Sequence, residues 1–214
     1  VEANKQAFDW GRRGAVSLEQ VEKIAMPVKP VIVQMPQNLE TLIRRRVAFL
    51  TEYQNAAYAK RYENLVAKVR DAEAGIGAGE TLSKAVAKYL FKLMAYKDEY
   101  EVARLYTSGD FEKRLHESFE GDFKVKYNLA PPLLAKRDAH GHLVKAQYGA
   151  WMKTAFTGLA KFKGLRGTAL DPFGYTGERK MERGLIRDYE SLIVEMLANL
   201  SPKNHRTAVE LASL

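Results

Sequence analysis

The chain has 214 residues, no cysteine, and 34 lysines and arginines against 26 aspartates and glutamates, so its formal net charge is +8 at pH 7. A chain of this length can bury a sizeable core, and 46% hydrophobic with 28% charged residues is typical of an ordinary folded protein. The lack of cysteine excludes disulfides, zinc–thiolate sites and Cys-ligated iron–sulfur clusters from these residues, and no apolar run approaches the ~18 residues of a membrane span.

The first part of the chain predicts two short helices and a linker. Helical spacing of apolar residues predicts a helix over residues 1–13 that stops at Gly14. Ser17 and the Gln three residues later form a capping box, which predicts a second helix over 18–25. Three prolines within 27–36 fix φ and remove amide donors, so we expect extended chain or a brief edge strand there.

The central part predicts long helices. Apolar residues keep a spacing of three or four over 39–69, which predicts one helix of about 31 residues capped by Asn38. Three glycines within 75–79 favour turn conformations and end it. Thr81 is expected to cap the next helix, which continues, with or without a kink, as far as Tyr106.

The last part mixes helices with irregular chain. A short helix begins at Ser108, and alternating polarity predicts a small hairpin that pairs 124–129 with 142–147. A helix over 151–162 follows. A glycine-rich loop then leads, through a cap at Thr176, to a helix over 177–200, and Ser201-Pro202 begins a final helix. The predicted fold class is mainly α: a multi-helix domain with one long helix and at most a small β-hairpin.

The glycine-rich loop is the most unusual segment. Glycines let a backbone approach a ligand closely, and the amides at a helix N-terminus attract anions. Arg166, Arg179 and Arg183 would therefore be candidate contacts for an anion such as a phosphate or a carboxylate. The loop matches no named phosphate motif. The interpretation we favour is a rigid loop whose arginines pair with acids of the protein itself.

Residues 96–104 supply acids for such pairs. Glu101 lies at helical spacing from Lys97 and from Arg104, which predicts local ion pairs. Asp98 and Glu99 are then the acids that the arginines of the loop would seek. Adjacent helical carboxylates point apart, so we assign no catalytic residue here.

The remaining polar groups predict neither a metal site nor a basic interface. His140 and His142 lie in a loop near Asp138, but nothing completes a four-ligand set. The run 44–46 of three arginines would spread around most of a helix, which is typical of a solvated surface. Each quarter of the chain carries a net charge between +1 and +3, so the charge is dispersed.

Several segments together resemble the C-terminal region of the fused bacterial indolepyruvate ferredoxin oxidoreductases, members of the 2-oxoacid:ferredoxin oxidoreductase family. The segments are EANKQAFDWGRR (2–13), LMAYKDEYEVARLYT (93–107), LAPPLL (129–134) and LRGTALDPFGYTGERKMERGLI (165–186). By this resemblance, residues 1–30 are the end of a γ-type domain plus a linker. Residues 31–214 are the helical domain of unknown function that follows, truncated at its C-terminus.

The resemblance implies an activity for the parent enzyme rather than for this piece. Such enzymes oxidatively decarboxylate aryl 2-oxoacids to acyl-CoA and reduce ferredoxin, using thiamine diphosphate and iron–sulfur clusters. Their thiamine site and cluster cysteines belong to other parts of the polypeptide, and no cofactor is expected within this chain. We expect a non-catalytic, structural or docking portion of a cytoplasmic enzyme. Its partners would be the other domains and ferredoxin, with no membrane.

The alternative is a helical module that binds nucleic acid or another anionic partner. A sequence pI near 9.5 is compatible with it. The dispersed charge and the lack of a known binding motif argue against it.

Overall fold

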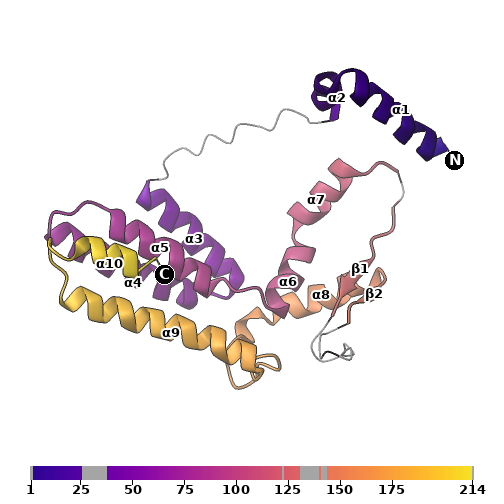
Figure 1. The fold of residues 1–214 in the computed structure, drawn as a ribbon. Helices are drawn as coiled ribbons and strands as arrows, with labels where there is room; N and C mark the ends of the chain where they lie inside the picture. Colours follow the sequence, from indigo (N-terminus) through magenta and orange to yellow (C-terminus); the bar gives the residue numbers. More distant parts are fainter. Residues whose placement is uncertain (1, 26–37, 122, 131–139, 141–143, 214) are drawn as a thin grey trace. The chain divides into compact units, whose positions relative to one another are not determined.

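The computed structural model describes five ranges of the chain: 2–25, 38–121, 123–130, 140 and 144–213 (Figure 1). Two compact units make up the chain, Val1–Gln37 and Asn38–Leu214. The domain boundary predicted at residues 30–31, and the proline-rich stretch predicted to be extended, lie outside the described residues. Among the described residues, no helix combines the length and the apolar content that crossing a membrane requires.

The first unit contains helices α1 (Glu2–Val16) and α2 (Leu18–Ala25), which contact each other. The bounds predicted for α2 are confirmed. The predicted end of α1 is wrong, because the helix runs through Gly14 to Val16; one interior glycine costs a helix only about 1 kcal/mol. α1 buries no side chain, and Phe8 and Trp10 on it are exposed.

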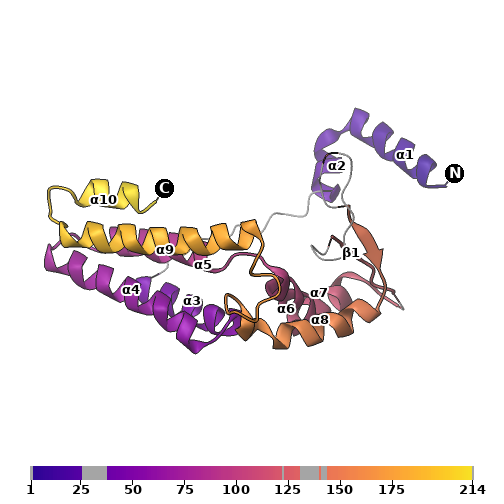
Figure 2. The same ribbon diagram turned by 90° about the horizontal axis from the view of Figure 1, so that it is seen from below.

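The second unit is mainly helical, as predicted, and its described residues contain one two-stranded antiparallel sheet. Helices α3, α4, α5 and α9 lie side by side, and α10 packs against α5 (Figures 1 and 2). The elements are α3 (Leu39–Tyr53), α4 (Ala56–Gly75), α5 (Thr81–Met94), α6 (Glu99–Thr107), α7 (Gly109–Ser118), β1 (Tyr127–Leu129), β2 (Ala146–Tyr148), α8 (Trp151–Lys161), the 3₁₀ helix η1 (Lys163–Leu165), α9 (Gly177–Ala198) and α10 (His205–Leu211).

Two hydrophobic cores lie in this unit. The larger core is formed by apolar side chains of α3, α4, α5, α9 and α10, with Leu50, Tyr62 and Leu90 fully buried at its centre. The smaller core joins α6, β1 and α8 through Ala103, Tyr127, Met152 and Phe156. The chain passes from the larger core to the smaller one between α5 and α6, and returns through η1 and the loop before α9.

The single long helix predicted over residues 39–69 is wrong, because two helices occupy this region. α3 ends at Tyr53, and Asn55 adopts an extended conformation with φ −168° and ψ 174°. Its side-chain oxygen accepts a hydrogen bond from the Tyr58 amide at 2.9 Å and so caps α4. An asparagine side chain offers the backbone an alternative to the helical hydrogen bond, which apolar spacing does not reveal. The predicted cap at Asn38 is confirmed by its bond to the Glu40 amide.

The N-terminus of α5 is capped from another helix rather than by Thr81. Glu80 occupies the cap position and makes no side-chain capping bond. Instead, the fully buried Glu73 carboxylate of α4 accepts bonds from the amides of Leu82 (2.7 Å) and Ser83 (2.8 Å) and from the Ser83 hydroxyl (2.6 Å). The His205 imidazole of α10 lies 2.7 Å from Oε1 of this carboxylate, the oxygen that also accepts from the Leu82 amide. One side chain therefore ties α4, α5 and α10 together.

The connections around α6 and α10 also differ from those predicted. The helix expected to continue to Tyr106 ends at Met94, and a new helix begins after Asp98. α10 begins at His205 rather than at Ser201-Pro202, because Asn204 accepts from the Ser201 amide and holds residues 201–204 in a turn.

The predicted hairpin is confirmed, but it is shorter. β1 and β2 pair antiparallel with Tyr127 opposite Tyr148, one residue beyond the predicted end of the second strand. The chain that links the two strands is described only in part.

Replacing Glu73 by Gln should lower the free energy of unfolding by about 2 kcal/mol, because the amide group cannot accept from all of its donors. Chemical denaturation measures this, and Glu63→Gln, at a partly exposed position of the same helix, serves as the control. A loss no larger than that of the control would show that Glu73 is not a structural cap.

The same carboxylate should make stability depend on pH. Burial alone would raise the pKa of Glu73, but the bonds from Ser83, His205 and the Leu82 amide together lower it. A lowered folded-state pKa gives stability that is present above the unfolded value near 4.5 and is lost as the pH falls through the folded value. Wild-type protein should therefore lose more unfolding free energy between pH 5 and pH 3 than Glu73→Gln does.

Candidate functional site

The glycine-rich loop before α9, called the arginine-rich loop from here on because it carries Arg166 and leads to Arg179 and Arg183, meets the acidic residues of 96–104. They form one buried polar network between the two cores. Arg166 is its centre and is 4% exposed. Its Nε and Nη2 donate to the two oxygens of Asp98, at 2.5 and 2.8 Å. Its Nη1 donates to the carbonyl oxygen of Tyr53 at 2.5 Å. All three guanidinium nitrogens are thus bonded to protein groups.

Aromatic rings enclose this ion pair. The Arg166 guanidinium carbon lies 3.6 Å from the centre of the Tyr53 ring and 5.5 Å from that of Tyr100. Cation–π attraction adds to the charge-assisted hydrogen bonds when water is excluded. Burial alone would lower the pKa of Arg166, but its hydrogen bonds to Asp98 raise it. The guanidinium therefore stays charged where it is buried.

Asp98 performs two tasks. Its Oδ1, besides accepting from Arg166, accepts from the Glu101 amide at 2.9 Å and caps α6. The N-terminal end of α6 and the loop before α9 consequently depend on one carboxylate. An aspartate is favoured at a helix N-cap for this reason, and its charge is favourable at the positive end of the helix.

The loop is held rigid by a second buried acid, Asp171. Its oxygens accept from the amides of Gly167 (2.7 Å) and Phe173 (3.1 Å) and from the Tyr100 hydroxyl (3.1 Å). Gly167 has φ +74°, a conformation that favours glycine, and a Cβ on Gly174 would lie 2.6 Å from Asp171 Oδ2. These two glycines therefore serve the internal geometry of the loop.

The other two predicted arginines bind different partners. Arg179 pairs with Glu182 and lies 3.5 Å from Glu99, whose pKa burial raises. Arg183 donates to the Gly174 carbonyl at 2.5 Å. The three guanidinium groups thus do not share a common partner in the structure.

Two buried atoms in this region lack a hydrogen bond: Nη1 of Arg183 and Oε2 of Glu99. Pairing of the loop arginines with Asp98 and Glu99 is confirmed for Arg166 and Arg179. Contact of Arg166, Arg179 and Arg183 with an anion stays a prediction.

A second ion-pair group adjoins the first. Arg104 donates to both oxygens of Glu101 at 2.8 Å, as the helical spacing predicted, and also lies 3.3 Å from Glu52. The pair predicted between Lys97 and Glu101 is wrong, because α6 begins at Glu99 and Lys97 precedes it. Lys163 of η1 donates to the Glu52 carbonyl at 2.5 Å. These contacts tie the C-terminal end of α3 to α6 and to η1.

The sequence reasoning missed several members of the network: Tyr53, Asp171, Glu52 and the Gln54 amide, which donates to the Arg166 carbonyl at 3.3 Å. The only local signal was the turn chemistry of Asp171 between Leu170 and Pro172. The other three belong to the end of α3, more than 100 residues before Arg166, and their pairing depends on the tertiary fold.

The histidines do not assemble a metal site among the described residues, where no group of three or more His, Asp or Glu side chains is placed to hold an ion. His205 instead bonds Glu73, and His116 packs against Phe123. Asp138 and His142 lie outside the described residues.

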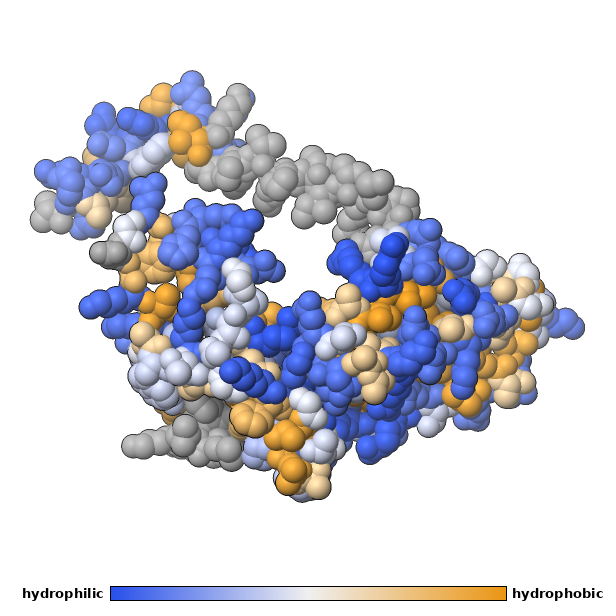
Figure 3. Space-filling view, turned by 180° about the vertical axis from the view of Figure 1, so that it is seen from behind, coloured by the Kyte–Doolittle hydropathy of each residue, from blue (hydrophilic) through white to orange (hydrophobic). Residues whose placement is uncertain are grey.

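The run of arginines on α3 is solvated in part. Arg44 and Arg45 are exposed, whereas the Arg46 guanidinium lies 4.9 Å from the centre of the Phe91 ring. Hydrophilic residues dominate the face shown in Figure 3, and hydrophobic residues form smaller patches between them.

Fold and site together define a mainly helical domain in which the arginines of the loop bond to groups of the domain itself. Residues 39–214 match the family described as "Family of unknown function (DUF6537)", and the chain belongs to this family. No curated protein and no solved structure matches the chain.

Replacing Arg166 by Gln should lower the free energy of unfolding by about 3–5 kcal/mol, because Asp98 would be left buried without its counter-charge. The exposed Arg187→Gln on α9 is the matched control and should change stability by less than about 0.5 kcal/mol. Combining Arg166→Gln with Asp98→Asn should cost less than the two single changes added together. Additive losses would mean that the two side chains do not interact in solution.

Proposed function

We propose that this chain is the helical, non-catalytic portion of an enzyme that resembles bacterial indolepyruvate ferredoxin oxidoreductase. The four sequence segments given above support the kinship. Thiamine diphosphate and iron–sulfur clusters would belong to the remaining domains, since a chain without cysteine cannot supply thiolate ligands.

A structural role is supported by where the similar segments lie. Segments 93–107 and 165–186 meet in the Arg166–Asp98 network, in which their charged groups bond mainly to one another. In this interpretation, the likeness to the enzymes marks residues that the fold requires. It gives the loop arginines the role of holding the domain together.

The single observation that carries a role in assembly is a row of exposed apolar residues on α9. Met181, Leu185 and Leu192 are spaced four and seven residues apart, which places them on one face of the helix, and they are 59%, 47% and 38% exposed. Exposed apolar residues gathered on one helix face suit a surface that packs against another protein or domain. The remaining domains of the parent enzyme are the partners that fit this proposal.

The complete enzyme offers a direct test. It should reduce ferredoxin in the presence of indolepyruvate and CoA, and Arg179→Gln and Arg183→Gln should leave the KM for CoA within twofold of wild type. A tenfold rise in that KM with unchanged thermal stability would instead make these arginines contacts of the CoA phosphates. Absence of any indolepyruvate-dependent reduction would contradict the proposed kinship.

Docking of ferredoxin is a second candidate role, supported by the net charge of +8. A positive surface raises the rate of encounter with an acidic partner, and salt weakens this effect. Charge reversal at Arg44, Arg45 and Lys161, which are all exposed, should raise the KM for ferredoxin at low ionic strength and leave the KM for CoA unchanged. An unchanged KM for ferredoxin would contradict steering by this domain.

A helical module for nucleic acid or another anionic partner remains the alternative function. A gel shift with arbitrary DNA or RNA that disappears at raised salt would support it. The structural proposal predicts no shift at physiological salt.

A further inference from the structure

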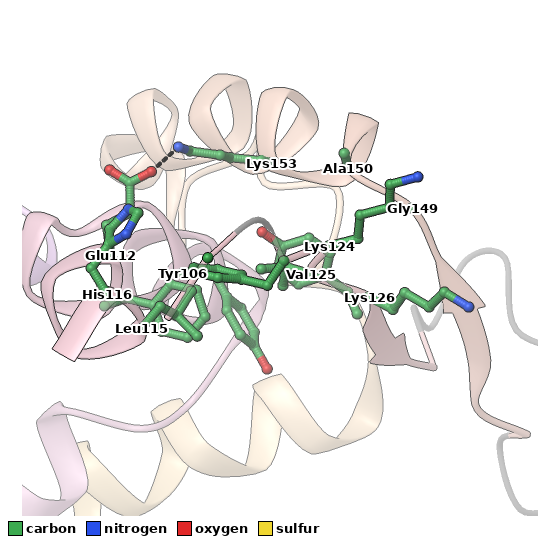
Figure 4. Close-up of a pocket in the computed structure, with 14 residues that line it drawn as sticks. Tyr106, Glu112, Leu115, His116, Lys124, Val125, Lys126, Gly149, Ala150 and Lys153 are labelled. Atoms are coloured by element: carbon green, nitrogen blue, oxygen red, sulfur yellow. Dashed lines mark hydrogen bonds and ion pairs between the residues drawn. The ribbon is translucent and has the colours of Figure 1, made fainter. Parts of the chain in front are cut away.

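A cavity of about 470 Å³ lies between α7, the N-terminal end of α8 and the segment that leads into β1 (Figure 4). Its volume falls within the roughly 300–1,000 Å³ of sites that hold small molecules. It is separate from the Arg166 network, and neither the resemblance nor the family match gives it a role. All of its lining residues belong to the second unit and to the described part of the chain.

Aromatic and aliphatic side chains form the base of the cavity, among them Tyr106, Leu115, Phe123 and Val125. Tyr106 is fixed in place: its ring stacks on Phe156 of the smaller core with centroids 5.3 Å apart and an interplanar angle of 5°. It also meets the rings of Phe111 and Tyr127 edge to face, at 5.1 and 5.2 Å. The base is therefore a preformed apolar surface that suits a flat ring.

The rim of the cavity carries more positive than negative charge. Among the described residues that line it, Lys124, Lys126 and Lys153 are basic and Glu112 is acidic. Lys124 and Lys126 are exposed and form no ion pair within the described part of the chain. Lys153 pairs with Glu112 across the cavity edge, and Figure 4 shows this pair extending from α8 to α7.

The ion pair between Glu112 and Lys153 spans the edge of the cavity and is easily broken. Both side chains are 50% exposed, and exposed ion pairs stabilise proteins very little. An anion that enters the cavity can therefore take the place of Glu112 beside the Lys153 ammonium at small cost. The His116 imidazole lies on the same helix face as Glu112, one turn further along α7.

We propose that this cavity binds a small organic anion with an aromatic body. The rings of the base contact its apolar part, and Lys153 binds its acidic group. Lys124 and Lys126 extend toward the opposite side of the cavity (Figure 4) and add positive potential there. The volume, the aromatic base and the exposed, weakly paired Lys153 at the rim carry this assignment together.

Two fluorescent probes test the ligand class on the complete 214-residue chain. 1-Anilinonaphthalene-8-sulfonate is an aromatic anion, and N-phenyl-1-naphthylamine is the same ring system without the sulfonate. The chain should bind one equivalent of the sulfonate at this site. Lys153→Gln should weaken that binding threefold to tenfold and leave the affinity for the neutral amine unchanged. Glu112→Gln should strengthen binding of the sulfonate, because Lys153 loses its competing partner.

Matched controls lie on the same two helices. Lys161→Gln on α8 and Glu117→Gln on α7 change the same charges at exposed positions that do not line the cavity, and both should leave the affinity unaltered. Circular dichroism confirms that each variant is folded. Equal affinity of wild type and Lys153→Gln for the sulfonate, or a weaker affinity in Glu112→Gln, would overturn the proposal. Tighter binding of the neutral amine than of the sulfonate would show an apolar site without anion preference.

Discussion

The bidentate pair of Arg166 and Asp98 connects the two cores of the second unit. Asp98 caps α6, which carries the smaller core, and Arg166 bonds to the last residue of α3, which belongs to the larger one. A buried ion pair adds little net stability over an apolar contact, because both charges lose their hydration. Its effect is instead to fix geometry: a bidentate pair between aromatic rings tolerates little change in distance or angle. The placement of α6, of the loop and of α9 relative to α3 follows from it.

This constraint changes how the arginine-rich loop is interpreted. A glycine-rich loop that leads into a helix N-terminus is found at many phosphate-binding sites. Here Gly167 and Gly174 accommodate the Asp171 side chain, and Arg166 is fully bonded within the protein. The cavity beside α7 lacks such a sequence pattern, yet it has the volume and the mixed lining of a ligand site. The residue pattern of the loop indicates a binding site, whereas the cavity is formed only by the packing of the folded chain.

Local signals in the sequence were sufficient for the fold class and for some of the element ends that are set by neighbouring residues. The equally local caps at Asn55 and Asp98 were missed, because apolar spacing runs on across them. Asn38 and Thr176 cap helices through bonds to amides two and three residues away, and both were predicted. The pairing of Asp98 with a loop arginine was also predictable from the sequence. Helical spacing supplied partners for Glu101 but none for Asp98. The cap that Glu73 provides for α5 was not predictable, since it depends on α4 and α5 lying antiparallel. The cavity was not predictable either, because its lining comes from three segments that only the tertiary fold brings together.

Native-state hydrogen exchange of the loop before α9 tests the account most directly. If the Arg166–Asp98 pair and Asp171 hold this loop as part of the core, the amides of Gly167 and Phe173 should exchange as slowly as buried amides of α4. In Arg166→Gln, these two amides should lose protection while those of α4 keep most of theirs. Rapid exchange of both loop amides in the wild-type protein would contradict the account.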